Sequence, residues 1–188
     1  MTEPLYSLTG LNMADAKKLI SAINFAAQKH KDQRRKDADL TPYINHPLNL
    51  LNILANEAGV TDLVTLISAV LHDTIEDTEA TANELTGLFG AEVTAIVLEV
   101  TDDKTLDKSA RKARQIETAP KKSLRAKHVK LADKIANLRD VADSPPARWT
   151  LERRQEYFDW AKAVVDALGA THPTLEHLFH QAYSRRPT

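Results

Sequence analysis

The sequence predicts an all-α fold, a bundle of helices with short loops, and two observations lead to this class. The chain has 188 residues but only five glycines, and it has few alternating runs of Val, Ile, Tyr and Thr, which argues against β-sheets. Apolar residues instead recur at spacings of three and four along the whole chain, as they do in helices that bury one face. The elements of the bundle follow from this pattern and from the residues that begin and end helices.

The N-terminal part of the chain predicts two helices separated by a polar loop. Residues 15–30 carry a broad apolar face that ends in a basic cluster. After the polar stretch 37–45, Pro47 stands where proline favours the first turn of a helix, and the apolar series behind it predicts a helix closed by Gly59. His46 is therefore expected at the start of that helix.

The next segment, 63–71, is apolar on nearly all sides, which predicts a buried central helix with Thr61 or Asp62 as its cap. A capping-box pattern further along predicts a helix that ends at Phe89. A highly charged, solvated helix is expected near 108–117. The remaining helices are expected over 92–100, 126–140, 150–168 and 174–183.

The balance of charge limits the classes of partner. Lysine and arginine number 25 against 26 acidic residues, so the net charge of -1 gives no general attraction to nucleic acid or to an anionic membrane. We therefore expect a small-molecule substrate that is recognised locally. The chain has no cysteine, which excludes disulfides, thiolate metal ligands and a cysteine nucleophile, so a metal site must use histidines and carboxylates.

The sequence shows no targeting signal. Residues 1–12 lack the basic segment and the continuous apolar stretch of a signal peptide, and no apolar run elsewhere is long enough to span a bilayer. We expect a cytoplasmic protein. Because no repeat or linker marks a second domain, we also expect a single domain over residues 1–188.

The His72-Asp73 doublet is the strongest local signal for chemistry. Two adjacent polar groups that can bind metal end an otherwise apolar helix, and burying them without partners would be costly. Glu76 and Asp77 follow the two members by four residues each, so one further helical turn would gather four ionisable groups. A bound cation would relieve the repulsion among the three carboxylates. The alternative for the doublet is a structural histidine beside an aspartate that ends the helix. The alternative for the group of carboxylates is an exposed, solvated helix end.

Asp133 and Asn137, four residues apart, share a face of the predicted helix 126–140. Apolar neighbours indicate that this face is partly buried, whereas a surface salt bridge from Asp133 to a neighbouring lysine or arginine is the alternative. With His46 and the doublet, Asp133 completes a set of two histidines and two aspartates. Such a mixture of nitrogen and oxygen donors suits manganese, iron or zinc rather than calcium.

The order His46, His72-Asp73, Asp133 resembles the H…HD…D arrangement of the HD superfamily, whose members place these groups on separate helices. Further stretches, in order, resemble more narrowly the hydrolase domain of the RelA/SpoT family, and within it the small alarmone hydrolases of the metazoan SpoT type. These stretches are Phe25 to Ala27, Gln33 to Asp37, Thr41 to Pro47, Leu71 to Thr78, and Val129 to Lys134 with Asn137 to Arg139.

The resemblance runs from about Phe25 to Arg139 and continues through Glu156 to Trp160. It implies an HD-type helical bundle around a metal site, with a motif-bearing core over about 20–165 and a C-terminal helix over about 174–183. Because the chain ends near Thr188, there is no room for the synthetase domain of the long family members.

The resemblance implies a manganese-dependent hydrolase. The reaction would remove the 3′-pyrophosphate from guanosine tetra- or pentaphosphate and yield GDP or GTP. An alternative keeps the same site and changes the substrate, since the metazoan relative is also associated with removal of the 2′-phosphate of NADPH, and adenosine analogues of the alarmone are further candidates. A non-catalytic nucleotide sensor is disfavoured because the chain retains the full set of ligands and acids.

The family roles can be carried over to residues of this chain. The attacking water would be positioned or deprotonated by Glu76 and Asp77, and one manganese ion would be held by His46, His72, Asp73 and Asp133. A carboxylate pair beside a metal is a plausible way to generate a nucleophile at neutral pH.

The same resemblance assigns substrate contacts. Arg35 would stack against the nucleotide base and Lys36 would lie near a phosphate, whereas a solvated charge run is the alternative for both. Asp140 stands where the long family members carry a small hydroxyl residue, and this departure bears on substrate preference. Tyr43 and Lys104 are further candidates, with side-chain packing and a loop charge as their alternatives. Nucleotide contacts are also expected from Asn137 and Arg139.

Overall fold

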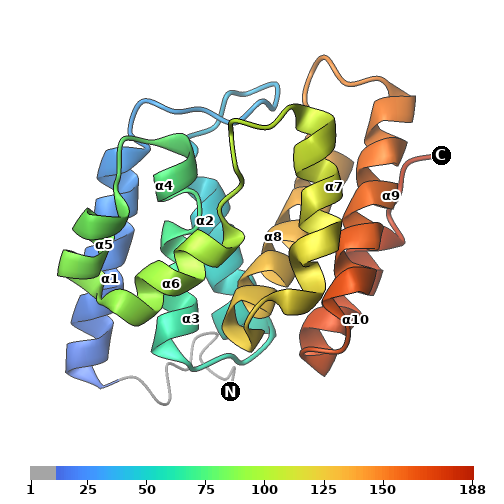
Figure 1. The fold of residues 1–188 in the computed structure, drawn as a ribbon. Helices are drawn as coiled ribbons and strands as arrows, with labels where there is room; N and C mark the ends of the chain where they lie inside the picture. The colour runs from blue at the N-terminus through green and yellow to red at the C-terminus, as the bar shows by residue number, and fades with distance from the viewer. Residues whose placement is uncertain (1–11) are drawn as a thin grey trace, which may run out of the picture.

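The computed structural model describes residues 12–188, and within that range the chain is built from helices and contains no strand (Figure 1). One isolated bridge, between Arg34 and Pro42, is the extended pairing found in the described residues. The predicted all-α class is confirmed. The expectation about the N-terminal segment falls on residues that, except for Asn12, lie outside the described part of the chain.

The helices follow one another with short connections and match the order expected from the apolar pattern. They are α1 (Met13–Lys29), α2 (Asn45–Asn52), the π-helical turn η1 (Ile53–Glu57), α3 (Leu63–Leu71), α4 (Thr74–Asp77), α5 (Ala82–Phe89), α6 (Ala91–Val100), α7 (Lys108–Thr118), the 3-10 turn η2 (Ala119–Lys121), α8 (Leu124–Asp143), α9 (Leu151–Leu168) and α10 (Pro173–Tyr183).

Helix α3 lies at the centre, because every residue from Thr65 to Leu71 is buried. Leu66 and Ala69 belong to the apolar cluster around α8 and α10, whereas Val70 belongs to the cluster shared with α1, α5 and α6. A helix covered on both sides needs apolar residues all around, which explains the uniform sequence of this segment. The doublet at its end is thus carried by the best-packed element of the fold.

The start of α3 is fixed by a side-chain cap. Of the two candidates, Asp62 is the cap, since its carboxylate accepts a hydrogen bond from the backbone N–H of Thr65 at 3.0 Å. Arg125 donates two hydrogen bonds, both 2.9 Å long, to the same carboxylate. Arg125 belongs to α8, so these hydrogen bonds hold the start of α3 against α8.

Helix α8 is longer than the predicted 126–140 and packs against α2, α3, α6, α9 and α10. Besides apolar residues it buries Lys130, Asp133 and Lys134. Charged groups in such a position are retained only with partners. Their presence in the middle of α8 therefore marks the part of the bundle where the site is built.

Two local features differ from the plain helices expected. After α2 the chain widens into η1, where the N–H of Ala58 donates to the carbonyl of Ile53 at 2.9 Å, an i to i−5 bond. After α3 the helix breaks at the doublet and resumes as the short α4.

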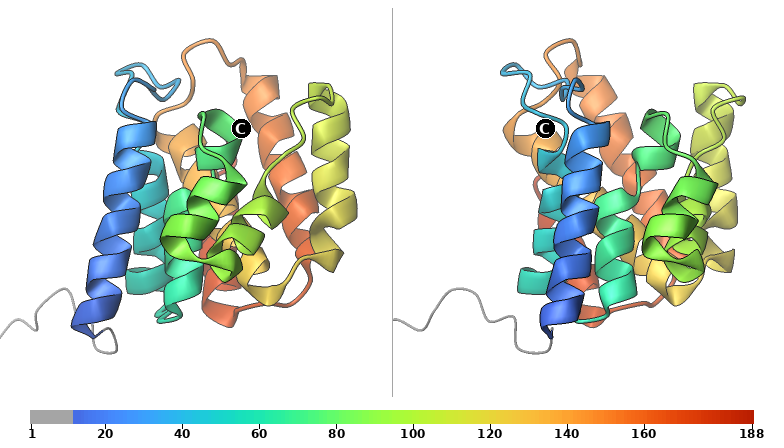
Figure 2. Two further views of the ribbon diagram at one scale, coloured as in Figure 1. Left: turned by 60° about the vertical axis from the view of Figure 1, so that its left-hand side comes forward. Right: turned by 90° about the vertical axis from the view of Figure 1, so that its left-hand side faces the viewer.

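The functional residues gather at one end of the bundle. The connections 30–44 and 144–150 lie at that end, close to α4 (Figure 2). Within residues 12–188, no helix combines the length and the apolar character needed to cross a bilayer.

Candidate metal and nucleotide site

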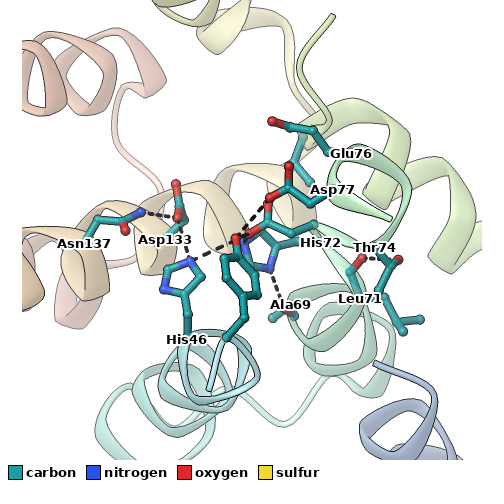
Figure 3. A network of polar contacts seen from close by, with 12 residues as sticks. His46, Ala69, Leu71, His72, Thr74, Glu76, Asp77, Asp133 and Asn137 are labelled. Atoms are coloured by element: carbon teal, nitrogen blue, oxygen red, sulfur yellow. Dashed lines mark hydrogen bonds and ion pairs between the residues drawn. The ribbon is translucent and has the colours of Figure 1, made fainter. Parts of the chain in front are cut away.

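Three buried side chains meet where α2, α3 and α8 approach one another. His46 lies in the first turn of α2, His72 directly follows α3, and Asp133 is in the middle of α8. One donor atom from each lies within 4.8 Å of the others (Figure 3). His46 Nε2 is 3.3 Å from Asp133 Oδ1. Three of the four ligands expected from the sequence thus form a compact cluster.

Asp73 joins this cluster from its edge. Its Oδ2 atom lies 2.9 Å from His72 Nε2 and 4.0 Å from His46 Nε2. The hydroxyl of Tyr43 donates to the same oxygen at 2.5 Å. The structure therefore brings all four expected ligands together, with Asp73 held in place by the phenol.

The orientation of His72 suits a metal ligand. Its Nδ1 lies 2.9 Å from the carbonyl oxygen of Ala69, and because a carbonyl only accepts, Nδ1 carries the hydrogen. In the neutral ring, Nε2 then presents a lone pair to the cluster. In this tautomer the buried Nε2 donates no hydrogen bond, and it faces the Asp73 carboxylate at 2.9 Å. A histidine fixed through one nitrogen, with the other turned toward neighbouring carboxylates, is the arrangement that protein metal sites use.

The charges of the cluster call for a cation. Burial by itself would lower the pKa of His72, but the Asp73 carboxylate outweighs it and raises the pKa to about 9. Burial would raise the pKa of Asp73, but the neighbouring His72 holds that pKa below its usual range. Burial would likewise raise the pKa of Asp133, but the neighbouring Lys134 holds it below its usual range. The buried Asp133 and the partly exposed Asp73 thus both remain ionised, and either a proton on His72 or a metal ion can balance them.

The donor set fits a divalent transition metal. Two imidazoles and two carboxylates are ligands that such ions accept, whereas calcium prefers oxygen alone. The Asp133 carboxylate is oriented by Asn137, whose Nδ2 donates to Oδ1 at 2.5 Å, and by Lys134, whose Nζ is 3.1 Å from Oδ2. The ion pair considered as the alternative for Asp133 therefore exists, but it is buried and helps to orient the carboxylate.

Glu76 and Asp77 lie on α4, one turn beyond the doublet. They are on the His72 side of the cluster, across from Asp133 and Asn137 (Figure 3). Glu76 Oε2 accepts a hydrogen bond from the backbone N–H of Asp102 at 2.8 Å. Burial raises the pKa of Glu76 to about 7, although this hydrogen bond acts in the opposite direction. A carboxylate with such a pKa exchanges protons readily near neutral pH.

Asp77 is held from two sides. One oxygen forms an ion pair with Lys104, and the other lies 3.3 Å from the hydroxyl of Tyr43. Tyr43 therefore links Asp77 to Asp73. The structure thus places Tyr43 and Lys104 beside the acids.

A cavity of about 660 Å³ adjoins the metal cluster. His46 from the cluster and Asp77 line it, together with Lys36 and Asn137. The connection after α1 supplies the basic residues and α8 supplies the amide. This base cavity, as we call it below, is large enough for a nucleotide-sized ligand.

Arg35 is fixed inside the base cavity. Its guanidinium pairs with Asp140 Oδ2 at 2.5 Å and donates to Asn137 Oδ1 at 3.3 Å. The guanidinium carbon is 5.7 Å from the centre of the Tyr43 ring. Asp140, the position that departs from the long family members, therefore sets the orientation of a planar cation.

The structure does not bring Arg139 to this cavity. Its guanidinium donates to both oxygens of Glu57 in η1, at 2.9 and 2.8 Å. The reason is helical geometry, because Arg139 follows Asn137 by two residues and therefore points about 200° around the helix from it. The expected nucleotide contact is not supported, and the residue instead links α8 to η1.

Sequence reasoning missed two aromatic residues of the site. Trp149 lies outside the stretches that match the family, and Tyr157 is only part of one, but both line the base cavity and a second cleft beside it. Their rings are 5.3 Å apart. Since α9 also buries aromatic side chains in the core, its pattern alone does not distinguish a lining residue from a packing residue.

Comparison with known proteins agrees with this geometry. The profile of the HD domain matches residues 22–162. The chain belongs to the HD-domain family. All four expected ligands of this HD domain lie inside the matched range, and so do Glu76 and Asp77.

The HD domain described here also has relatives of similar length. It is 51% identical over 173 residues to guanosine-3′,5′-bis(diphosphate) 3′-pyrophosphohydrolase MESH1 of Mus musculus, covering 92% of this chain and 97% of that protein. It is 53% identical over 172 residues to MESH1 of Homo sapiens, covering 89% and 96%. A solved structure described as a metazoan ortholog of SpoT that hydrolyzes ppGpp superposes with a TM-score of 0.87 at 49% identity, covering 90% of this chain and 95% of the other.

Proposed function

We propose that this chain is a manganese-dependent hydrolase that removes the 3′-pyrophosphate from guanosine 3′,5′-bis(diphosphate) and its pentaphosphate, releasing GDP or GTP and pyrophosphate. The buried cluster of His46, His72 and Asp133 carries this proposal. It stands beside two acids and a nucleotide-sized cavity, in a chain about half identical to curated hydrolases of that substrate over most of its length.

One manganese ion would be held by His46, His72, Asp73 and Asp133. When bound, it supplies Lewis-acid polarisation of a phosphoryl oxygen and stabilises the charge that develops in the transition state. The mixed donors of the cluster, and the Nε2 of His72 that is turned toward it while Nδ1 is held by Ala69, support this assignment.

Glu76 and Asp77 prepare the water that attacks the phosphorus. Glu76, whose pKa burial raises to about 7, takes the proton from this water. Asp77, fixed by Lys104 and Tyr43, accepts a hydrogen bond from the same water and sets its direction. The bond between the attacked phosphorus and the 3′ oxygen breaks, the 3′ oxygen takes up a proton to become the hydroxyl of GDP or GTP, and the phosphoryl group leaves with the water oxygen as pyrophosphate.

The base cavity holds the nucleoside. Arg35 offers a planar face that Asp140 and Asn137 keep in one orientation, and a purine stacks on it. Lys36 supplies a compact positive charge to a phosphate at the rim. Lys104 and Tyr43 act through Asp77 and Asp73 rather than through the base.

The partners follow from the same arrangement. The ligand is a small nucleotide rather than nucleic acid or a membrane, because the net charge is -1 and recognition is confined to a cavity. We further propose that the enzyme is cytoplasmic, and we assign the whole chain to one hydrolase domain.

Product identification tests the proposal. Purified protein would be incubated with guanosine 3′,5′-bis(diphosphate), its adenosine analogue or NADPH, each with Mn²⁺ and after metal removal. Pyrophosphate and GDP, formed only with metal, are the expected products. Orthophosphate from NADPH with the guanosine substrate untouched would favour the 2′-phosphatase alternative, and binding without turnover would favour a sensor.

A further inference from the structure

Lys134 is a cation inside the core of the bundle. It follows the proposed ligand Asp133 on α8, and only 2% of the residue is exposed. Its Nζ lies 3.1 Å from Oδ2 of Asp133, and among residues 12–188 this carboxylate is the hydrogen-bond partner of the ammonium. One oxygen cannot satisfy three N–H groups, so a buried ammonium in this position needs a further stabilising contact.

The further contact is the indole ring of Trp160, on α9. Lys134 Nζ lies over this ring, 4.2 Å from its centre. The face of an indole is electron-rich and attracts a cation, and the attraction is larger where water is excluded. The ammonium is therefore held by two groups, the Asp133 carboxylate and the aromatic face of Trp160.

Trp160 is itself held in one orientation. Its Nε1 donates a hydrogen bond to the backbone carbonyl of Lys112 on α7 at 3.1 Å, and the centre of its ring is 5.3 Å from that of Tyr157. Helices α7 and α9 pack side by side (Figure 1). The packing of these two outer helices thus fixes the ring that lies against Lys134.

Trp160 also separates Lys134 from the second cleft. This cleft lies between α7 and α9 and has a volume of about 490 Å³, and Trp160 lines it whereas Lys134 does not. The indole is partly exposed, while the lysine beneath it is buried. A shorter side chain at position 160 would therefore give water a path to the ammonium, and a hydrated ammonium has less reason to stay beside Asp133.

The two oxygens of Asp133 have different partners. Oδ1 is 3.3 Å from Nε2 of His46 and accepts a hydrogen bond from Asn137, whereas Oδ2 faces Lys134. The lysine thus fixes the rotation of the carboxylate and keeps Oδ1 on the side of His46. Groups that orient a ligand in this way strengthen the binding of the metal.

We propose that Trp160 is a positioning residue for the metal site. Its ring keeps the Lys134 ammonium on Oδ2 of Asp133, and Oδ1 thereby stays turned toward His46. The inference rests on the proposed function and deepens it, because it names a residue of α9 that acts on a proposed ligand of α8. Trp160 acts through Lys134 and Asp133, without touching the metal. The alternative is a ring that only packs between helices.

Mn²⁺ affinity without substrate tests this role. Trp160→Leu removes the aromatic face, and its Kd for Mn²⁺ in titration calorimetry should rise about 10-fold, since residues that orient ligands are worth about 10- to 100-fold. Trp160→Phe keeps an aromatic face and should change the Kd less than about 3-fold. Tyr183→Leu removes a partly buried ring from α10 and is the control for lost packing, with an unchanged Kd. If Trp160→Phe lost as much affinity as Trp160→Leu, the aromatic face would not be the active feature and the proposal would fail.

A double-mutant cycle separates positioning from packing. Lys134→Met removes the ammonium and should also raise the Kd for Mn²⁺ about 10-fold. If Trp160 acts through Lys134, the variant with both changes should bind Mn²⁺ no more weakly than either single variant. Effects that multiply, with a Kd raised about 100-fold in the double variant, would mean that the ring only packs, and would overturn the proposal.

NMR gives a readout that needs no metal. Because Lys134 lies over the indole, the ring current should move its ε-CH₂ protons upfield in the unmodified chain. The shift should disappear in Trp160→Leu and persist in part in Trp160→Phe, so the unmodified chain and the Phe variant decide the question even if the Leu variant does not fold.

The outcomes separate this inference from the proposed function. Unshifted Lys134 protons in the unmodified chain, or equal Mn²⁺ affinity in the unmodified chain and a folded Trp160→Leu, would overturn the positioning role and leave the proposed hydrolysis intact. An unmodified chain that does not bind Mn²⁺ would overturn both.

Discussion

The metal cluster and the rim of the base cavity are built in opposite ways. His46, His72 and Asp133 are only 2%, 5% and 8% exposed and stand on helices of the central core. Arg34 and Lys36, which line the base cavity, are by contrast exposed and belong to the connection after α1. The metal cluster is thus held in place by core packing, whereas the residues expected to recognise the substrate lie on loops. Loops can vary in sequence without disturbing the fold. Substitutions in the two regions should therefore have effects of different kinds.

Removing a ligand from the cluster should have the largest effect. His72→Ala is expected to weaken Mn²⁺ binding by more than about 100-fold, since even residues that only orient ligands are worth about 10–100-fold, and turnover should disappear. Titration calorimetry and product release measure the two effects. His128→Ala, a half-buried histidine away from the site, is the control.

Metal binding should also be visible as stability. With Mn²⁺ at 100 times its Kd, the free energy of unfolding should rise by about 2.7 kcal/mol in the unmodified chain and not in His72→Ala. If Mn²⁺ raised the thermal midpoint of both proteins equally, His72 would not be a metal ligand. The proposed difference between the metal cluster and the cavity rim would then fail.

Glu76→Gln should separate chemistry from metal binding. The variant keeps the shape of the side chain but loses the base, so kcat should fall by about 10²- to 10⁴-fold while Mn²⁺ affinity is retained. Stopped assays at saturating substrate measure the rate, with Glu117→Gln on the exposed face of α7 as the control. A fully active Glu76→Gln would show that another group takes the proton.

The pH dependence of kcat should report the same residue. The base acts when deprotonated, so kcat should fall as the pH drops through the pKa of Glu76, which burial raises to about 7. A bound divalent cation favours the carboxylate and moves this fall to lower pH. A rate profile from pH 5 to 9 measures it, and a rate that increases toward acid would contradict the assigned role.

At the rim the effects should be smaller and appear in KM. Lys36→Ala is expected to raise KM about 10-fold, with kcat largely retained, because the lysine contributes charge to binding and not to the reaction. Lys31→Ala, an exposed lysine that does not line the cavity, should leave both constants unchanged. If Lys36→Ala behaves like Lys31→Ala, the basic run is only a solvated face.

Arg139→Gln should have the smallest effect. The ion pair with Glu57 is partly exposed, so its loss should lower the free energy of unfolding by up to about 1 kcal/mol, measured by denaturant titration. KM and kcat should match those of the unmodified chain. A raised KM would restore Arg139 to the substrate contacts expected from the resemblance.

The same contrast explains what the sequence could predict. Apolar periodicity is dictated by burial, so the sequence predicts the central helix over 63–71 with the bounds that the structure has, and it limits the cap to Thr61 or Asp62. The doublet is identifiable because polar groups at the end of an apolar helix are unusual, whereas the family resemblance adds His46 and Asp133 as expected ligands. These signals are local, and they come from the part of the molecule where packing leaves little freedom.

Features that depend on contacts between distant segments could not be read in this way. The cleft between α7 and α9 forms only when two charged helices pack together, and neither sequence alone distinguishes a lining cation from a solvated one. The ion pair of Arg35 with Asp140 joins residues far apart in the chain. The expected contact of Arg139 came from the family motif and not from helix geometry, and the structure pairs this side chain with Glu57 instead.

The break between α3 and α4 makes the length of this segment as important as its composition. The doublet ends one helix, and the two acids occupy the single turn that follows. Inserting or deleting one residue there would rotate the acids by about 100° around the helix axis relative to the doublet. During divergence this stretch should therefore accept conservative exchanges at a side chain such as Ile75, which only packs against the neighbouring apolar cluster, but it should not accept insertions or deletions.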